Sequence, residues 1–244
     1  MRNILTLLIV LGVNLTFAQK KINIVFVGNS ITQGALIKQP AVDSPPAQCV
    51  KILNDKGYEV NYANCGVSGA TTVDFLPAAE TLFVKVANAA GKMSGRILFS
   101  VSLGTNDSAS TATTGAPISA AQYYVNLKAI TDELTKLYAD CLIVIHYPIW
   151  YSSNTYNSAM YLEEGQKRLL SYRPMIERLA SEFANIYVGD TAAYAFFEHN
   201  YLENFFAENG RAGTFYLHPN EAGAKKLAQY WANPIIGILT QKSY

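Results

Sequence analysis

The sequence predicts an α/β fold with three layers, in which helices cover both faces of a mostly parallel, five-stranded β-sheet. Strand-like segments alternate with helix-like segments along the chain, which is typical of a parallel sheet with helical crossovers. Most of the strand-like segments are almost continuously apolar, as expected for strands that are buried on both faces. Half of the residues are hydrophobic and only 15% are charged, which supplies enough apolar side chains for a sizeable core.

Five segments are rich in β-branched and aromatic residues and end at a Gly, Pro or Asn, which is the pattern of short strands bounded by turns. The clearest is the run INIVFV, which ends at Gly28. The run RILFSVSL, which ends at Gly104, is apolar enough to be a central strand. The predicted strands are 22–27, 58–63, 96–103, 141–147 and 186–188.

Six further segments carry the start and stop signals of helices. Ser119 can cap one of them, Gly57 can end another, and Pro174 is expected to bend the longest. The last helix contains Pro234, which could interrupt it. The predicted helices are 45–56, 77–90, 119–138, 159–183, 191–206 and 220–239.

The first 18 residues have the layout of a secretory signal peptide. A short basic start is followed by an almost unbroken apolar run at 4–13 and by a small residue, Ala18, at a plausible cleavage point. The run is shorter than the roughly 20 residues that span a bilayer. We therefore expect cleavage near Ala18, a secreted or periplasmic protein with no membrane span, and one domain at 19–244.

The charge and cysteine content exclude several classes of protein. The formal net charge is +1 and no Lys/Arg cluster is present, so nucleic acid is not an expected partner. The three cysteines, Cys49, Cys65 and Cys141, include no C-x-x-C pair, which argues against a zinc or thioredoxin-like site. Export would permit a disulfide, but the odd count leaves at least one thiol free, and both the pairing and the oligomeric state stay open.

In open parallel sheets, ligands bind beyond the carboxyl ends of the strands. The residues that follow the predicted strands are 28–30, 66–69, 104–107 and 147–150. Ser30 lies on a strand-to-helix turn, where helix N–H groups favour negative charge, although taken alone a serine there is better explained by helix capping. Ser68 is a rival, because Gly66 to Ala70 nearly matches the nucleophile elbow G-x-S-x-G, with Ala70 in place of the last glycine.

Two further residues could take part in chemistry at this place. Asn106 follows the third predicted strand and could direct its amide N–H at an oxyanion, or could simply stabilise a turn. His218 lies on a loop just before the last predicted helix, where it could belong to a site or could be a hydrogen-bonded surface residue. His146 lies within a strand and His199 within an aromatic helix, so structural roles are expected for both.

Four segments of the chain resemble, in order, sequence blocks of the SGNH/GDSL hydrolases. They are Gly28–Thr32, Asn64–Gly69, Gly104–Asp107 and His218–Pro219, and together they span nearly the whole mature chain. The resemblance implies the flavodoxin-like SGNH hydrolase fold and a serine esterase that needs no metal or cofactor. It also implies that Ser30, rather than Ser68, is the nucleophile and His218 its base, with an oxyanion hole made by the Ser30 and Gly69 N–H groups and the Asn106 side chain.

The sequence departs from the family pattern at two positions. Asn29 replaces the usual Asp before the nucleophile, and that Asp is not the acid of the triad. Phe215 occupies the position, three residues before His218, where the family carries that acid. We hypothesise a Ser–His dyad whose imidazole is held by a backbone carbonyl or by an acid from elsewhere. Asp190 is a candidate, although a helix-capping role fits it better.

The expected function is removal of O-acetyl groups from a carbohydrate, such as sialic acid or another glycan. Gly34-Ala35 and 215–220 resemble the SGNH modules of exported bacterial enzymes that deacetylate glycans, sialate O-acetylesterases among them. The alternatives are a lipolytic esterase or thioesterase, and a glycan-binding module with weakened catalysis. A stacking wall for a sugar, or ordinary packing, could involve Tyr147, Trp150, Tyr151 and Tyr156.

Overall fold

The central sheet consists of five parallel strands. The computed structural model describes residues 20–242, and the predicted signal peptide at 1–18 lies outside that range. The strands are β1 (Lys20–Gly28), β2 (Tyr58–Asn64), β3 (Ile97–Ser102), β4 (Leu142–Ile145) and β5 (Ile186–Val188). They pair in the order β2-β1-β3-β4-β5, which is the flavodoxin-like order, so the predicted α/β fold is confirmed and this sheet is parallel throughout.

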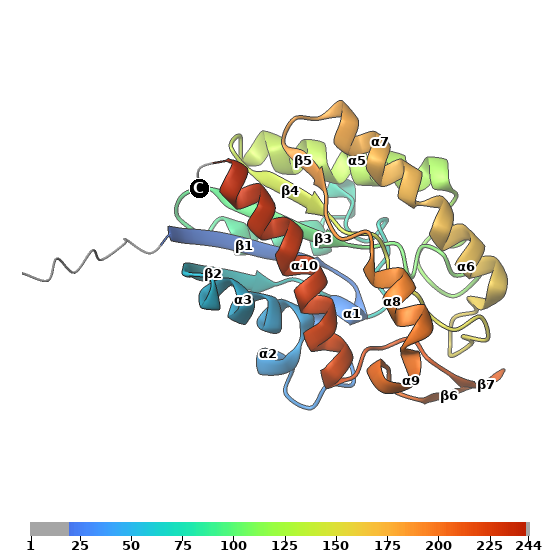
Figure 1. Ribbon diagram of the computed structural model, residues 1–244. Coiled ribbons are helices and arrows are strands. Elements are labelled where there is room, and N and C mark those ends of the chain that lie inside the picture. Colours follow the sequence, from blue (N-terminus) through green and yellow to red (C-terminus); the bar gives the residue numbers. More distant parts are fainter. Residues whose placement is uncertain (1–19, 243–244) are drawn as a thin grey trace, which may run out of the picture.

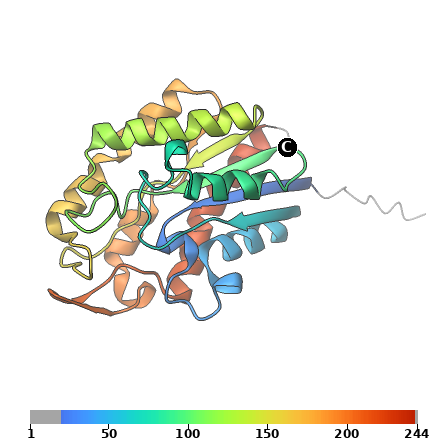
Figure 2. The ribbon, with the colours of Figure 1, turned by 180° about the vertical axis from the view of Figure 1, so that it is seen from behind.

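Helices cover both faces of this sheet. One face is covered by α3 (Pro45–Asp55) and α10 (Glu221–Gln241), which pack against each other (Figure 1). The opposite face is covered by α4 (Leu82–Ala90) and α5 (Ala120–Leu137), which Figure 2 shows from behind. At the edge of the sheet, α7 (Arg173–Glu182) packs against β5 and α5. Because β3 and β4 are buried along their whole length, their side chains form the centre of the core.

Three predicted helices are each interrupted once. The predicted 77–90 helix divides into a short 3₁₀ helix, η1 (Pro77–Ala79), and α4. The predicted 159–183 helix divides into α6 (Leu162–Ser171) and α7, whose first turn holds Pro174, where the missing N–H costs no hydrogen bond. The aromatic 191–206 segment divides into α8 (Ala193–His199) and α9 (Tyr201–Asn204). In contrast, α10 continues through Pro234.

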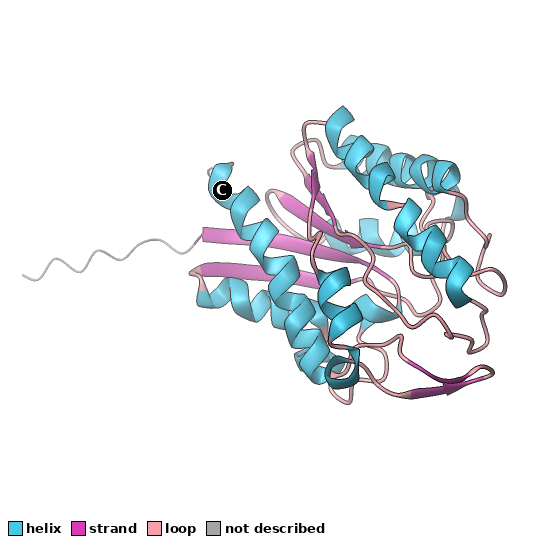
Figure 3. Ribbon diagram, turned by 45° about the vertical axis from the view of Figure 1, so that its right-hand side comes forward, coloured by secondary structure: helices cyan, strands magenta, loops and turns pink. Residues whose placement is uncertain are grey.

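Two very short helices were not among the six predicted ranges, α1 (Ser30–Gln33), which is the helical turn expected after β1, and α2 (Pro40–Asp43). A small antiparallel hairpin of β6 (Glu208–Gly210) and β7 (Gly213–Phe215) was also missed. Its strands have three residues each and no alternation of polar and apolar side chains, so the strand pattern had no signal there. Figure 3 shows this hairpin apart from the central sheet, beside the edge where the parallel strands end.

The three cysteines, Cys49, Cys65 and Cys141, are buried free thiols. They therefore act as small core residues. Among the helices at 20–242, none is both long and apolar enough to cross a membrane.

Candidate active site

Ser30 lies on the sharp turn from β1, an inner strand of the sheet, into α1. Asn29 caps this helix, because its Oδ1 accepts a hydrogen bond from the Ile31 N–H at 3.0 Å. Ser30 is the first helical residue, and the first N–H groups of a helix have no intrahelical partner. The Asn at position 29, where the family has Asp, thus holds the turn that presents Ser30.

The structure brings His218 to Ser30, 188 residues away in the sequence. The Nε2 atom of His218 lies 2.9 Å from the Ser30 Oγ. The loop that carries the histidine is held on both sides: the Phe206 N–H donates to the His218 carbonyl at 3.0 Å, and the Asn220 side chain caps α10. A hydroxyl and an imidazole are therefore in hydrogen-bonding contact above the end of β1.

The other nitrogen of His218 faces a carboxylate that the sequence did not single out. His218 Nδ1 lies 2.9 Å and 3.0 Å from the two carboxylate oxygens of Glu208, and the His218 backbone N–H lies 3.2 Å from one of them. An ionised carboxylate can only accept, so Nδ1 carries the ring proton of a neutral His218. The lone pair on Nε2 then faces the hydroxyl of Ser30, which is the arrangement a general base requires.

Glu208 lies directly across the hairpin from Phe215, the position at which the family carries its acid. It lies on β6 and pairs with Phe215 of β7, the residue three positions before His218. Residues that are directly opposite in an antiparallel pair project to the same face. Phe215 is only 1% exposed and packs in the core, while its partner places a carboxylate against the histidine. The acid is thus on the neighbouring strand.

Asp190, which the sequence offered as a candidate to hold His218, is used elsewhere. Its carboxylate accepts from the N–H groups of Ala192 and Ala193 at the start of α8, which is the alternative capping role. Burial raises the pKa of this carboxyl, and these N–H groups oppose that shift. Glu208, rather than Asp190 or a backbone carbonyl, contacts the second nitrogen of His218.

The loop after β2 packs against the turn that carries Ser30. A side chain at Gly66 would come within 2.3 Å of the Gln33 backbone nitrogen, so only glycine permits this close approach. The Val67 N–H donates to the Gly28 carbonyl at 3.0 Å, which fixes the loop two residues before Ser30. Gly69, further along this loop, is exposed and has a φ of +79°, a conformation that favours glycine.

Asn106 joins the same cluster from the loop after β3. Its Nδ2 donates to the Ala70 carbonyl at 2.9 Å, which ties the Asn106 side chain to the residue after Gly69. Its Oδ1 accepts from the Tyr161 hydroxyl at 2.7 Å. The bonds at Val67 and Asn106 gather the three residues expected to form an oxyanion hole, Ser30, Gly69 and Asn106, at one edge of the sheet.

The rival serine and the other histidines have different surroundings. Ser68 is exposed, and both its N–H and its hydroxyl bond to the side chain of Gln33. His146 is fully buried beneath α10, where its ring stacks on Trp231. His199 is exposed and bonds to a carbonyl of its own helix. These placements agree with the structural roles expected for the two histidines.

The aromatic residues after β4 do not form an open stacking wall. Tyr147, Trp150 and Tyr151 are each less than a tenth exposed and pack within the protein. Tyr156 is half-buried, with the guanidinium of Arg211 over its ring. Ordinary packing, the alternative given for this group, therefore describes the first three, because their rings already have protein neighbours.

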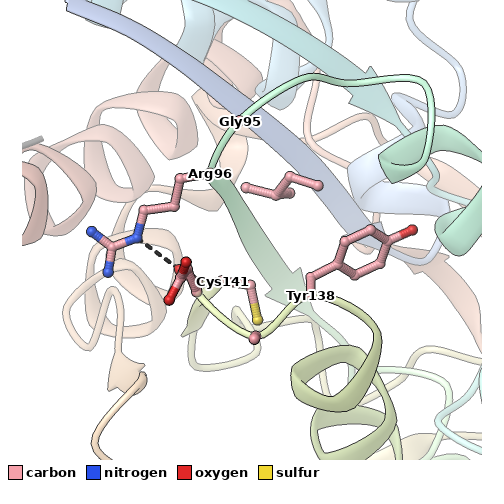
Figure 4. A pocket seen from close by; sticks show the side chains of 7 residues that line it. Gly95, Arg96, Tyr138 and Cys141 are labelled. Carbon is pink, nitrogen blue, oxygen red and sulfur yellow. Dashed lines mark hydrogen bonds between the residues drawn. The ribbon is translucent and has the colours of Figure 1, made fainter.

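Two hollows lie at opposite ends of the parallel strands. A hollow of about 350 Å³ borders Gly69 and Ala70 at the edge where Ser30 lies. Another, of about 590 Å³, lies where β3 and β4 begin, and Figure 4 shows that Arg96, Tyr138 and Cys141 line it. The second is at the amino ends of the strands, far from the gathered polar groups. In the range 20–242, no cluster of three or more His, Cys, Asp or Glu side chains could hold a metal ion.

The chain is similar to known proteins in sequence pattern and in fold. A family model described as the GDSL-like lipase/acylhydrolase family matches residues 26–226. Among solved structures, a lipase/acylhydrolase from Enterococcus faecalis is 18% identical, with a TM-score of 0.61 and coverage of 91% of this chain and 96% of that chain. A search of the curated proteins found no match.

Two further structural neighbours are carbohydrate esterases by their descriptions. One is a catalytic mutant of an acetylxylan esterase from Geobacillus stearothermophilus, at 19% identity and a TM-score of 0.62, covering 88% of this chain and 94% of that chain. The other is a family 3 carbohydrate esterase from Clostridium thermocellum, at 16% identity and a TM-score of 0.60, covering 92% of this chain and 100% of that chain. At such identities these likenesses concern the fold.

Proposed function

Because the chain belongs to the GDSL-like lipase/acylhydrolase family, the SGNH/GDSL serine hydrolases that act on esters, we propose that it removes O-acetyl groups from carbohydrates. The observation that carries the catalytic part of this proposal is the hydrogen-bonded series Ser30–His218–Glu208. We assign Ser30 as the nucleophile, His218 as the general base and Glu208 as the acid that orients the imidazole.

The first half of the reaction acylates Ser30. His218 Nε2 takes the proton of the Ser30 hydroxyl as its oxygen attacks the ester carbonyl carbon. The carbonyl oxygen becomes an oxyanion, which the Ser30 and Gly69 N–H groups and the Asn106 side chain are proposed to stabilise. When the tetrahedral intermediate collapses, the imidazolium gives its proton to the leaving sugar hydroxyl, and the acetyl group stays on Ser30.

The second half releases acetate. A water molecule gives a proton to His218 and attacks the acyl-enzyme, and collapse of the second intermediate returns the proton to Ser30 Oγ. In both halves the histidine is transiently positive, and the Glu208 carboxylate at 2.9 Å stabilises that charge and fixes the ring orientation.

The hollow beside Gly69 supports a polar substrate rather than a long acyl chain. Its lining includes four hydroxyl side chains and one carboxylate, and no aromatic ring. The lining residues are Val67, Ser68, Gly69, Ala70, Asp74, Thr81, Leu82, Ala112, Thr113 and Thr114. Hydroxyl and carboxylate groups can hydrogen-bond to sugar hydroxyls, whereas a long acyl chain binds best in a continuous apolar groove. Structural neighbours described as esterases of acetylated xylan and mannan give the same indication.

The first experiment tests the nucleophile. We expect a fluorophosphonate probe to add one phosphonyl group to the protein, and peptide mapping to place it on Ser30. Ser30→Ala is expected to lose the label, while Ser100→Ala, which changes the other serine in contact with a histidine, is expected to keep it. A label elsewhere, or none, would contradict the assignment.

The second experiment tests the substrate. Acetate release is measured from acetylated xylan, acetylated mannan and O-acetylated sialic acid, alongside 4-nitrophenyl esters with acyl chains of increasing length. We expect activity on at least one acetylated sugar and a preference for the acetyl ester over long-chain esters. A preference for long chains would favour a lipolytic enzyme. Sugar binding without hydrolysis would favour a binding module.

We also propose that the protein is exported, on the layout of its first 18 residues. Expression of the full chain in a bacterium, followed by N-terminal sequencing of the protein outside the cytoplasm, is expected to give a chain that begins at Gln19. An intact chain that still carries Met1 and remains in the cytoplasm would overturn this proposal.

A further inference from the structure

The amide of Asn106 is held by two hydrogen bonds that together fix which way it faces. The Ala70 carbonyl lies 2.9 Å from one end and can only accept, so the amide nitrogen must face it. The Tyr161 hydroxyl lies 2.7 Å from the other end and donates to Oδ1. An amide nitrogen carries two hydrogens, and only one is used on Ala70. The second remains for a ligand.

The backbone of Asn106 is already fixed by other contacts. Its carbonyl accepts from the Thr113 hydroxyl at 2.8 Å and from the Ala109 N–H at 3.2 Å. The remaining freedom is a rotation of the amide by half a turn. That rotation would place Oδ1 against the Ala70 carbonyl and would present an acceptor, instead of a donor, to the oxyanion. The Ala70 carbonyl can only accept and opposes this rotation, while the hydrogen bond from Tyr161 to Oδ1 anchors the other end of the amide.

The Tyr161 hydroxyl is buried and keeps its proton, which it donates to Asn106 Oδ1. The side chain is 3% exposed and packs edge-on against Tyr151, with ring centroids 5.4 Å apart. Burial, and after it the negative charge of Glu208, raise the pKa of Tyr161, so the hydroxyl keeps its proton at neutral pH. It therefore donates to Asn106 throughout the range in which the protein is expected to work.

The backbone around Tyr161 adopts an unfavourable conformation. The next residue, Leu162, has a φ of +54°, which is uncommon for a residue with a side chain. The N–H groups of Tyr161 and Leu162 both donate to the Thr155 carbonyl at 3.2 Å, which holds this turn. Such conformations persist only where the surroundings impose them, and they occur often near functional sites.

We propose that Tyr161 is a positioning residue, which fixes the Asn106 amide so that one Nδ2 hydrogen points into the oxyanion hole. This inference rests on the proposed function, because it assumes that Asn106 stabilises an oxyanion. Tyr161 acts through Asn106 and does not touch the substrate. Its donation to Oδ1 also polarises the amide, which strengthens the hydrogen bond that Nδ2 offers.

The test compares Tyr161→Phe with Tyr151→Phe. Tyr151 is a matched control, because its hydroxyl is equally buried and bonds to Ser108 at 2.9 Å on the same loop, without touching Asn106. For 4-nitrophenyl acetate we expect Tyr161→Phe to lower kcat about tenfold, with KM changed less than about twofold. The rate of fluorophosphonate labelling at Ser30 is expected to fall by a similar factor. Tyr151→Phe is expected to change neither rate by more than about twofold.

A double-mutant cycle separates positioning from a structural role. Asn106→Ala is expected to lower kcat about a hundredfold, and adding Tyr161→Phe to it is expected to cost nothing further. Equal losses from Tyr161→Phe in both backgrounds, or an equal loss in Tyr151→Phe, would overturn the inference while leaving the proposed function intact. A wild-type protein that neither hydrolyses esters nor reacts with the probe would overturn the proposed function, and this inference with it. If Tyr161→Phe fails to fold, Tyr161→Met replaces it in the same cycle.

Discussion

Two serine–histidine hydrogen bonds of the same length occur among residues 20–242. In one, Ser30 Oγ lies 2.9 Å from Nε2 of His218; in the other, Ser100 Oγ lies 2.9 Å from Nε2 of His146. The first pair lies at the carboxyl edge of the sheet and the second is buried beneath α10. Judged by the serine and the Nε2 atom alone, the two pairs are the same.

The difference lies at the other nitrogen of each ring. Nδ1 of His146 accepts a hydrogen bond from the Asp190 backbone N–H at 3.0 Å, so a neutral His146 carries its proton on Nε2 and donates to Ser100. Nδ1 of His218 donates to the Glu208 carboxylate, so its Nε2 accepts from Ser30. His146 therefore cannot remove the proton of its serine, whereas His218 can.

The surroundings of the two rings reinforce this difference. His146 is fully buried, and burial lowers its pKa to about 3, so it stays neutral near neutral pH. The His218 side chain is 13% exposed, and its Nδ1 lies 2.9 Å from the Glu208 carboxylate. A serine next to a histidine is thus not enough for nucleophilic catalysis, because the partner of Nδ1 decides the direction of proton transfer.

The largest expected effect is that of removing Ser30, and removing Ser100 is the matched comparison. Ser30→Ala is expected to lower kcat/KM for an acetyl ester by four to six orders of magnitude, on the order of known triad knockouts. Ser100→Ala is expected to leave activity within about twofold of wild type. Steady-state hydrolysis of 4-nitrophenyl acetate measures both. Comparable activity in the two variants would remove the distinction between the pairs.

The second prediction removes the partner of Nδ1. Glu208→Ala is expected to lower kcat by about a thousandfold or more, because His218 loses the group that fixes its tautomer and stabilises its positive charge. Asp190→Ala, which changes the acid first suggested from the sequence, is expected to keep near wild-type activity. If Asp190→Ala proves the more damaging substitution, Glu208 is not the acid of this site.

The third prediction concerns the dependence of stability on pH. The pKa of His146 is depressed in the folded protein and about 6.5 in the unfolded chain, so the unfolded chain takes up a proton first as pH falls. The contribution of the neutral His146 ring to the free energy of unfolding is therefore fully present above about pH 6.5 and is lost toward pH 3. At pH 4.5 the loss is about 2–3 kcal/mol. His146→Gln is expected to weaken this dependence in urea unfolding measured between pH 4.5 and 7.5.

Asp107, a buried carboxyl, changes the stability with pH in the opposite direction. Wild type and His146→Gln both contain it. Burial raises the pKa of Asp107 to about 6, so its stabilising protonated form is lost as pH rises through that value. Subtracting the free energy of unfolding of His146→Gln from that of wild type at each pH therefore isolates the contribution of His146. An unchanged pH dependence in His146→Gln would mean that this ring is protonated in the folded protein.

The smallest expected effects are structural. Asp190→Ala removes a helix cap and is expected to lower the free energy of unfolding by about 1 kcal/mol. Ser100→Ala leaves the Nε2 proton of His146 without its partner and is expected to cost about 1–3 kcal/mol. Urea unfolding at pH 7 checks both values. No change in either variant would show that these contacts are not maintained in solution.

The parts of the molecule that could be predicted are those with strong local signals. The run 22–27 and the run 96–103 correspond to β1 and β3, because strands buried on both faces need continuous apolar side chains. The resemblance of four segments to the family's sequence blocks was enough to predict that Ser30 and His218 share a site, and their side chains lie 2.9 Å apart.

Glu208 was missed because its position depends on pairing across a hairpin rather than on spacing from His218. The hairpin strands have three residues each, and the Asn209-Gly210 pair, which is common in turns, lies within β6 rather than in the turn at 211–212. Tyr161 was missed for a similar reason, because its contact with Asn106 joins residues that are 55 positions apart. Both roles arise from tertiary contacts that leave no periodic pattern in the sequence.

The most direct test is to observe which ring nitrogen of each histidine carries the proton. Long-range ¹H–¹⁵N NMR spectra of the protein at neutral pH distinguish the two tautomers, and substitution of each of the three histidines assigns the signals. We expect His218 to carry its proton on Nδ1 and His146 to carry its proton on Nε2. A His218 ring with its proton on Nε2 and a bare Nδ1 would contradict the account.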